Sequence, residues 1–303
     1  MGRDFTLSFL YSNNRAQEGV YSMKQCVNLL WYDIQRGCLE NKKKILLLLG
    51  IGVASCLWFE SSLKNLYAVG YYADATLGDY LFYIFCGINY YSNAEGNLLP
   101  QIWLLYQIYI MFLSAYYPYS CLHGMGQQSW IRSNNRVVWW LEKCVWIFVQ
   151  VILCYTFMLG SVFGYCIIKG IPTSLELSES LCRFYYGIVD VRTLLTVKDF
   201  NLILFVVFPF VSAAIGIFQM ALGIVLKPQV AFIVTVAYLF SSIYIASPFL
   251  LGNYNMLLRY RMIGGENFVT GAMALISSCI LIVVAILVGG MRVLNMDVLS
   301  KRK

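Results

Sequence analysis

Residues 123–143 read HGMGQQSWIRSNNRVVWWLEK and form a polar, cationic stretch between two long apolar runs. If residues 131–143 are helical, one side of the helix carries cations and indole rings at steps of three and four residues: Arg132, Arg136, Trp139, Trp140 and Lys143. Trp rings favour a membrane boundary, where Arg and Lys stems lie along them with their charges in water. The stretch therefore predicts a helix at the inner rim of a membrane. The plainer alternative is an ordinary positively charged loop.

The composition places the rest of the chain in a membrane. Of its 303 residues, 60% are apolar and 12% are charged, whereas soluble domains carry about 25% charged residues. The ten cysteines are scattered, without the short paired spacing of a zinc site or a disulfide framework. These features predict one integral membrane domain without a metal site.

Six apolar runs are long enough to cross about 30 Å of hydrocarbon: 45–62, 100–122, 144–168, 200–226, 229–250 and 268–290. Six crossings put both termini on one side. With the termini, the 123–143 loop and Lys227 in the cytoplasm, that side holds 15 Lys and Arg and 6 Asp and Glu, against 7 and 9 outside. The positive-inside rule favours this orientation in the cell membrane, and it explains the basic charge without nucleic acid.

The segments between and before these runs predict helices that lie on or dip into the membrane. Residues 23–40 have an amphipathic helical rhythm, so we expect an interfacial "elbow" helix within a cytoplasmic segment 1–44. Residues 63–99 contain a helical pattern too short to cross, and 171–199 opens with Thr173 and Glu176 at capping-box spacing. The expected fold is therefore all-α, with a six-span domain over 45–290 and a cytoplasmic tail over 291–303.

The apolar runs lack the groups that chemistry or ion coupling usually needs. Their most polar long side chains are Gln107, Gln150 and Gln219, and Pro209 is expected to loosen the fourth run. Ion-coupled carriers usually have ionisable groups within the membrane, although broken helices lined by backbone can bind Na⁺. Hydrolase, metalloprotease and phosphate-loop motifs are absent from the sequence, and His123 is the only histidine. We therefore predict no catalytic, cofactor-binding or metal-binding residues in this chain.

Several segments resemble the permease subunit of bacterial type-2 ABC exporters of the kind linked to peptide or antibiotic export and immunity. The segment IRSNNRVVWWLEK at 131–143 resembles a basic, Trp-Trp, Lys run of that family, with Asn134 and Asn135 where the family often has a basic or small residue. The segments Asp79-Tyr80-Leu81, NYNMLLR at 253–259 and NMDVL at 295–299 also look familial. The resemblance covers most of the chain.

The resemblance implies a coupling helix at about 127–141 that docks on a separate ABC ATPase, which would bind MgATP. The residues expected at this contact are Arg132, Arg136, Trp139, Trp140, Glu142 and Lys143. It also implies a second permease chain, identical or related, and export of an amphipathic peptide, drug or lipid. The alternative from another class is a membrane sensor or scaffold that anchors a cytoplasmic partner through the same loop without transport.

Overall fold

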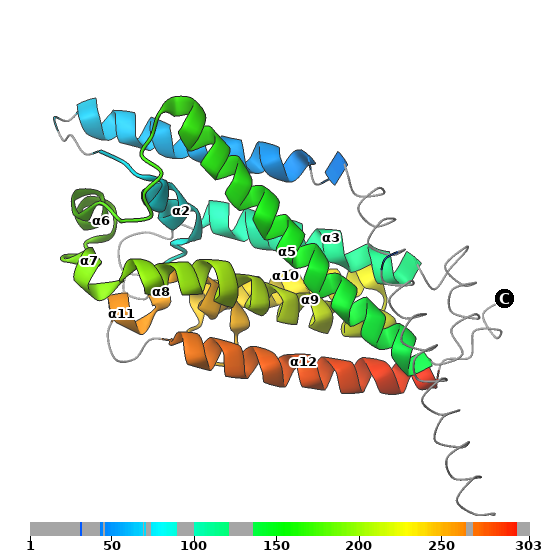
Figure 1. Ribbon diagram of the computed structural model, residues 1–303. Coiled ribbons are helices and arrows are strands. Elements are labelled where there is room, and N and C mark those ends of the chain that lie inside the picture. Colours follow the sequence, from blue (N-terminus) through cyan, green and yellow to red (C-terminus); the bar gives the residue numbers. More distant parts are fainter. Residues whose placement is uncertain are drawn as a thin grey trace, which may run out of the picture.

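The computed structural model describes residues 31, 43–44, 46–68, 70, 74–89, 100–120, 136–264 and 269–295, and its regular elements are helical (Figure 1). Of the predicted elbow helix at 23–40 only Trp31 lies within these residues, and the predicted coupling helix at 127–141 is described only from Arg136 onward. The elements in chain order are a helix Leu46–Ala68, α2 Leu77–Phe85, α3 Gln101–Ser120, α5 Arg136–Lys169, α6 Glu179–Tyr186, α7 Val191–Leu194, α8 Val197–Leu202, η2 Ile203–Val207, α9 Phe208–Val225, α10 Pro228–Tyr244, η3 Leu251–Asn255, η4 Leu257–Arg259, α11 Arg261–Gly264 and α12 Gly271–Leu294.

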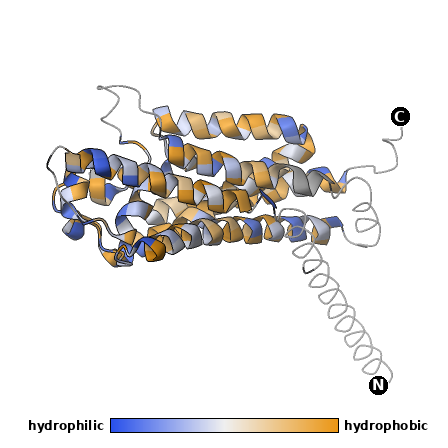
Figure 2. Ribbon diagram, turned by 90° about the horizontal axis from the view of Figure 1, so that it is seen from above, coloured by the Kyte–Doolittle hydropathy of each residue, from blue (hydrophilic) through white to orange (hydrophobic). Residues whose placement is uncertain are grey.

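Four helical stretches in the described part of the chain are long and apolar enough to cross a membrane: Leu46–Ala68, Arg136–Lys169, Val197–Val225 and Gly271–Leu294. Two apolar helices are shorter, Gln101–Ala115 within α3 and Pro228–Tyr244, which is α10. Every one of the six predicted apolar runs thus contains a helix, four of them of spanning length. Figure 2 shows hydrophobic residues along the long helices and hydrophilic ones gathered toward the ends of the bundle. The described part of the chain is all-helical, and its apolar helices are compatible with a multi-pass membrane protein.

Helix α9 forms the centre of the bundle, and α12 lies at its side (Figure 1). In the most apolar 18-residue part of the Val197–Val225 stretch, 72% of the residues are buried, whereas in that of α12 only 17% are. The exposed face of α12 repeats large apolar side chains at helical spacing, including Ile276, Ile280 and Leu287. Such a face is stable when it meets hydrocarbon or another apolar helix.

Pro209 loosens this central helix, as the sequence predicted. A five-residue π-helical segment, η2, precedes it, and the Phe208 N–H bonds to the carbonyl of Ile203, five residues back. Proline has no N–H to donate, so a wider turn beside it keeps the neighbouring backbone groups paired.

Short elements gather at the end of the bundle away from the start of α5 (Figure 1). A capping box lies at Thr76 and Asp79, at the start of α2. The predicted capping box at Thr173 and Glu176 is wrong, because the next helix, α6, begins only at Glu179. Residues 172–178 are not helical there, because the carbonyls of Pro172 and Ser174 accept the first N–H groups of α2. Asp79 also accepts a hydrogen bond from the Ser178 N–H, at 2.9 Å. Burial raises the pKa of this carboxyl, while its hydrogen bonds act in the opposite direction.

Two non-spanning pieces enter the bundle from this end and meet inside it. The first is α2, which is buried along nearly its whole length. The second, residues 245–260, we call the inserted segment; it follows α10 and contains η3 and η4. The Leu258 N–H donates to the carbonyl of Cys86 at 3.0 Å, directly after α2. Gly87 has a φ of 69° and lies so close to Met256 that a Cβ there would be 2.4 Å from the Met256 side chain.

Candidate functional site

The predicted coupling residues in the described part of the chain lie where α5 begins against the end of α12, which we call the loop end of the bundle. Arg132 lies outside the described residues. Arg136, the first residue of α5, donates from Nη1 to the carbonyl of Leu294, the last residue of α12, at 2.7 Å. A cation at the carboxyl end of a helix pairs with carbonyls that have no helical partner and with the negative end of the helix dipole.

Trp140 fastens the same helices together one turn further on. Its indole N–H donates to the carbonyl of Ile286 at 3.0 Å, so it reaches α12 from α5. The ring lies close against Gly289, and a Cβ placed on that glycine would be 2.1 Å from the Trp140 Cζ2 atom. A glycine at this position is what lets the indole approach the α12 backbone.

The other predicted residues, Trp139, Glu142 and Lys143, are buried, whereas Arg136 is exposed. Trp139 and Lys143 are each 1% exposed, and the Lys143 Nζ lies 5.5 Å from the centre of the Trp139 ring. Lys143 Nζ is 3.8 Å from Glu142 Oε1, a carboxylate that is itself buried. We predicted indole rings at the membrane rim with the Lys143 charge in water. Both tryptophans instead lie inside the bundle, because this part of α5 crosses α12 there.

A second cluster of polar side chains lies deep in the bundle, around one of the three glutamines that the sequence singled out. Four buried residues from four segments meet there and form what we call the polar centre: Gln107 of α3, Tyr155 of α5, Ser212 of α9 and Asn255 of η3. Gln107 Nε2 donates to the Tyr155 hydroxyl at 3.2 Å, which lies 2.9 Å from Ser212 Oγ. Ser212 Oγ donates to Gln107 Oε1 at 3.1 Å and closes a ring of three hydrogen bonds. Asn255 Nδ2 donates to Ser212 Oγ at 2.9 Å.

Aromatic rings and the inserted segment enclose the polar centre. Phe85, at the end of α2, stacks on Tyr155 with ring centres 5.9 Å apart and an angle of 7° between the rings. Phe208 packs against Phe85 from α9. The Trp103 indole N–H donates to the backbone carbonyl of Asn255 at 2.7 Å. The sequence singled out Gln107, but nothing in its pattern showed that Tyr155, Ser212 and Asn255 would meet it.

Arg259 holds the inserted segment in place. Its guanidinium is buried and donates to the carbonyls of Ser242 and Ile243 in the last turn of α10, and to Asn253 Oδ1. Its Nε donates to the carbonyl of Ile88 at 3.2 Å. Non-helical backbone is tolerated at membrane depth only when protein groups satisfy it. Arg259 does this for the carbonyls at the end of α10 and for Ile88 after α2, and it binds the inserted segment through the Asn253 side chain.

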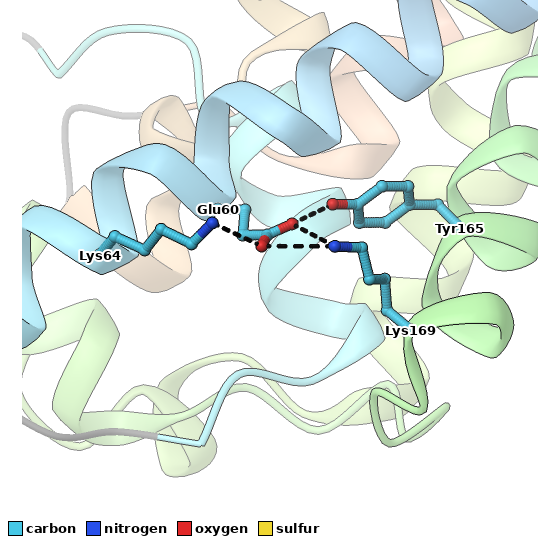
Figure 3. Close-up of polar contacts among 4 residues, drawn as sticks. All are labelled: Glu60, Lys64, Tyr165 and Lys169. Carbon is cyan, nitrogen blue, oxygen red and sulfur yellow. Dashed lines mark hydrogen bonds and ion pairs between the residues drawn. The ribbon is translucent and has the colours of Figure 1, made fainter.

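A partly exposed ionic cluster joins the Leu46–Ala68 helix to the far end of α5 (Figure 3). Glu60 accepts from the Tyr165 hydroxyl, and its carboxylate lies 3.3 Å from Lys169 Nζ and 3.0 Å from Lys64 Nζ. The Lys64 side chain is 70% exposed, so water and salt screen much of the attraction.

Replacing Glu60 with glutamine is therefore expected to lower the free energy of unfolding by less than about 1 kcal/mol. The effect should shrink further at high salt. The measurement is unfolding in detergent micelles at two salt concentrations, with the exposed Glu179→Gln as the matched control. A loss above about 3 kcal/mol would mean that this cluster is a major support of the fold.

Among the described residues, no group of three or more His, Cys, Asp or Glu side chains is arranged to hold a metal ion, and the described cysteines are free thiols. Comparison of the chain with protein-family models, curated proteins and solved structures gives no match.

Proposed function

We propose that the chain is the membrane permease subunit of an ATP-driven exporter that moves an amphipathic substrate, with a separate ABC ATPase bound at the loop end. In this proposal all six apolar helices cross the cell membrane, with α3 and α10 as the short crossings, and both termini are cytoplasmic. Two permease chains, identical or related, form the transporter, and MgATP binds to the ATPase subunits.

The observation that carries the proposal is the double attachment of α5 to α12 at the loop end. The 123–143 stretch runs directly into α5, whose first residues bind the carbonyls of Leu294 and Ile286 through Arg136 and Trp140. Helix α12 in turn packs along α9, the buried centre of the bundle. A displacement of the loop would therefore move α5 and α12 together and would reach the centre of the bundle.

The free energy needed to switch the permease between two states is within the range that ATPase binding can supply. A shift of a two-state permease from 1:99 to 99:1 needs about 5.5 kcal/mol of differential binding. ATP-driven closure of two ATPase subunits supplies this differential if the closed pair fits only one arrangement of the two loops. The bonds of Arg136 and Trp140 to α12 mean that a displacement of the start of α5 also displaces α12.

Charge reversal in the loop tests the proposal. Arg132→Glu combined with Arg136→Glu is expected to weaken association with the ATPase, or to uncouple ATP hydrolysis from substrate, while membrane insertion is unchanged. Co-purification from the native host followed by an ATPase assay measures both effects.

Because Arg136 also binds Leu294, Arg132→Glu alone is the cleaner variant. The matched control is Arg261→Glu, an exposed arginine of α11 at the other end of the bundle. Full association and coupling in the double variant would contradict the proposal. A partner that binds but does not hydrolyse ATP would favour a sensor or scaffold instead.

A further inference from the structure

We infer that Asn255 is a ligand-binding residue whose side-chain oxygen accepts a hydrogen bond from an uncharged N–H or O–H group of an amphipathic molecule inside the bundle. The inference deepens the proposed function, because it names the chemistry of the substrate, and its biological meaning rests on that function. The binding itself can be tested without an ATPase.

The hydrogen-bond ring of the polar centre fixes which way the Asn255 amide faces. Gln107, Tyr155 and Ser212 form a closed ring, and a serine hydroxyl has one proton. Whichever direction the ring runs, Ser212 gives its proton to a ring member and offers only a lone pair to Asn255. The amide must therefore turn its NH₂ group to Ser212, as it does in the structure.

This orientation leaves an acceptor without a donor. Asn255 Oδ1 is buried and has no hydrogen-bond partner among the described residues. A buried carbonyl oxygen without a partner is unfavourable, and within hydrocarbon there is no bulk water to serve it. Oxygen accepts from N–H and O–H groups, so a ligand that brings one such donor gains a contact for which the protein is already arranged.

The surroundings define the rest of the ligand. All four side chains of the polar centre are uncharged, and Phe85, Trp103 and Phe208 lie around them. An ammonium group would have to lose its water there without meeting a carboxylate of the polar centre, which is costly. The guanidinium of Arg259, four residues along the chain, adds positive charge. The site thus favours an apolar molecule with a neutral polar group over a cationic one.

One wall of the site is formed by two pieces that do not cross the membrane. Asn255 belongs to the inserted segment, and α2, which carries Phe85, is also shorter than a membrane crossing. These two pieces touch each other through the Leu258 and Cys86 backbone groups. A joint displacement of the two pieces would open the polar centre while α3, α5 and α9 remain whole.

The test compares two neutral probes that differ by one N–H group. N-octylacetamide has an amide N–H, and N-methyl-N-octylacetamide has none. Their affinities for the purified chain in detergent are obtained from the rise in the unfolding midpoint with probe concentration. We expect the N–H probe to bind roughly two- to tenfold more tightly, as one net hydrogen bond allows. Octylammonium is expected to bind more weakly than either.

Variants assign the preference to Asn255. Asn255→Leu is expected to bind both amides equally, with Asn255→Met in its place if the leucine variant does not fold. The matched control is Gln150→Leu, which removes another buried carboxamide with an unpartnered oxygen and should keep the preference. Equal binding of the two amides by the unaltered chain, or an unchanged preference in the Asn255 variants, would overturn the inference. Either result is independent of whether an ATPase binds the loop.

Discussion

Replacing Arg259 with methionine is expected to lower the free energy of unfolding by about 3–5 kcal/mol. Methionine keeps much of the buried volume but removes every donor. The carbonyls of Ser242 and Ile243 and the amide oxygen of Asn253 would lose the guanidinium that they now share. Unfolding in mixed micelles, followed by helix content, measures the loss.

Two further arginine variants separate this effect from a general loss of charge. Arg261→Met removes a nearby but exposed arginine and is expected to cost less than about 1 kcal/mol. Arg259→Lys should give an intermediate loss, because one ammonium cannot reach acceptors on α10, the inserted segment and Ile88 together. If Arg259→Met were no more harmful than Arg261→Met, the inserted segment would have some other support.

Gly289→Ala is expected to destabilise the protein by about 1–3 kcal/mol, although it adds a single methyl group. The added Cβ would lie 2.1 Å from the Trp140 ring, which is far inside contact distance. The bulky indole must then move away from α12, and its hydrogen bond to Ile286 should be lost with it. The measurements are the unfolding midpoint and, in the proposed complex, the coupling of ATP hydrolysis to substrate.

The adjacent glycine provides a matched control. A Cβ on Gly290 would be 3.5 Å from Trp140, an ordinary contact, so Gly290→Ala is expected to be nearly neutral. Trp140→Phe combined with Gly289→Ala should recover part of the stability, because the smaller ring makes room for the methyl group. Equal effects of the two glycine variants would show that the indole does not determine the spacing of α5 and α12.

The sequence predicted the helical runs well because length and hydropathy are local properties, but it misplaced the end of α10. We expected that run to continue to residue 250, and the helix ends at Tyr244. The apolar residues beyond it begin the inserted segment with a non-helical stretch. The Asn253 side chain donates to the carbonyls of Ile245 and Ser247 there, and the Tyr238 hydroxyl donates to that of Phe249. A hydropathy pattern does not show hydrogen-bond partners that lie later in the chain or on another turn of a helix.

The residues predicted for the site face another helix, and their contact with an ATPase stays a prediction. Arg136 and Trp140 do share one face of a helix, but this face packs on α12 rather than meeting the membrane rim. The same residue types suit both places, since indole and guanidinium groups bind carbonyls as readily as they bind headgroups. The signal that favoured the interior was the Gly289-Gly290 pair in the last apolar run, which allows a large ring to approach the backbone.

The most direct test of the central claim is to isolate the tagged chain from its native host in mild detergent and to assay the proteins that accompany it for ATP hydrolysis. We predict an ATP-hydrolysing subunit at close to one per permease chain, with turnover that responds to an uncharged amphipathic substrate. Recovery of the chain alone, or with a partner that does not hydrolyse ATP, would contradict the exporter assignment.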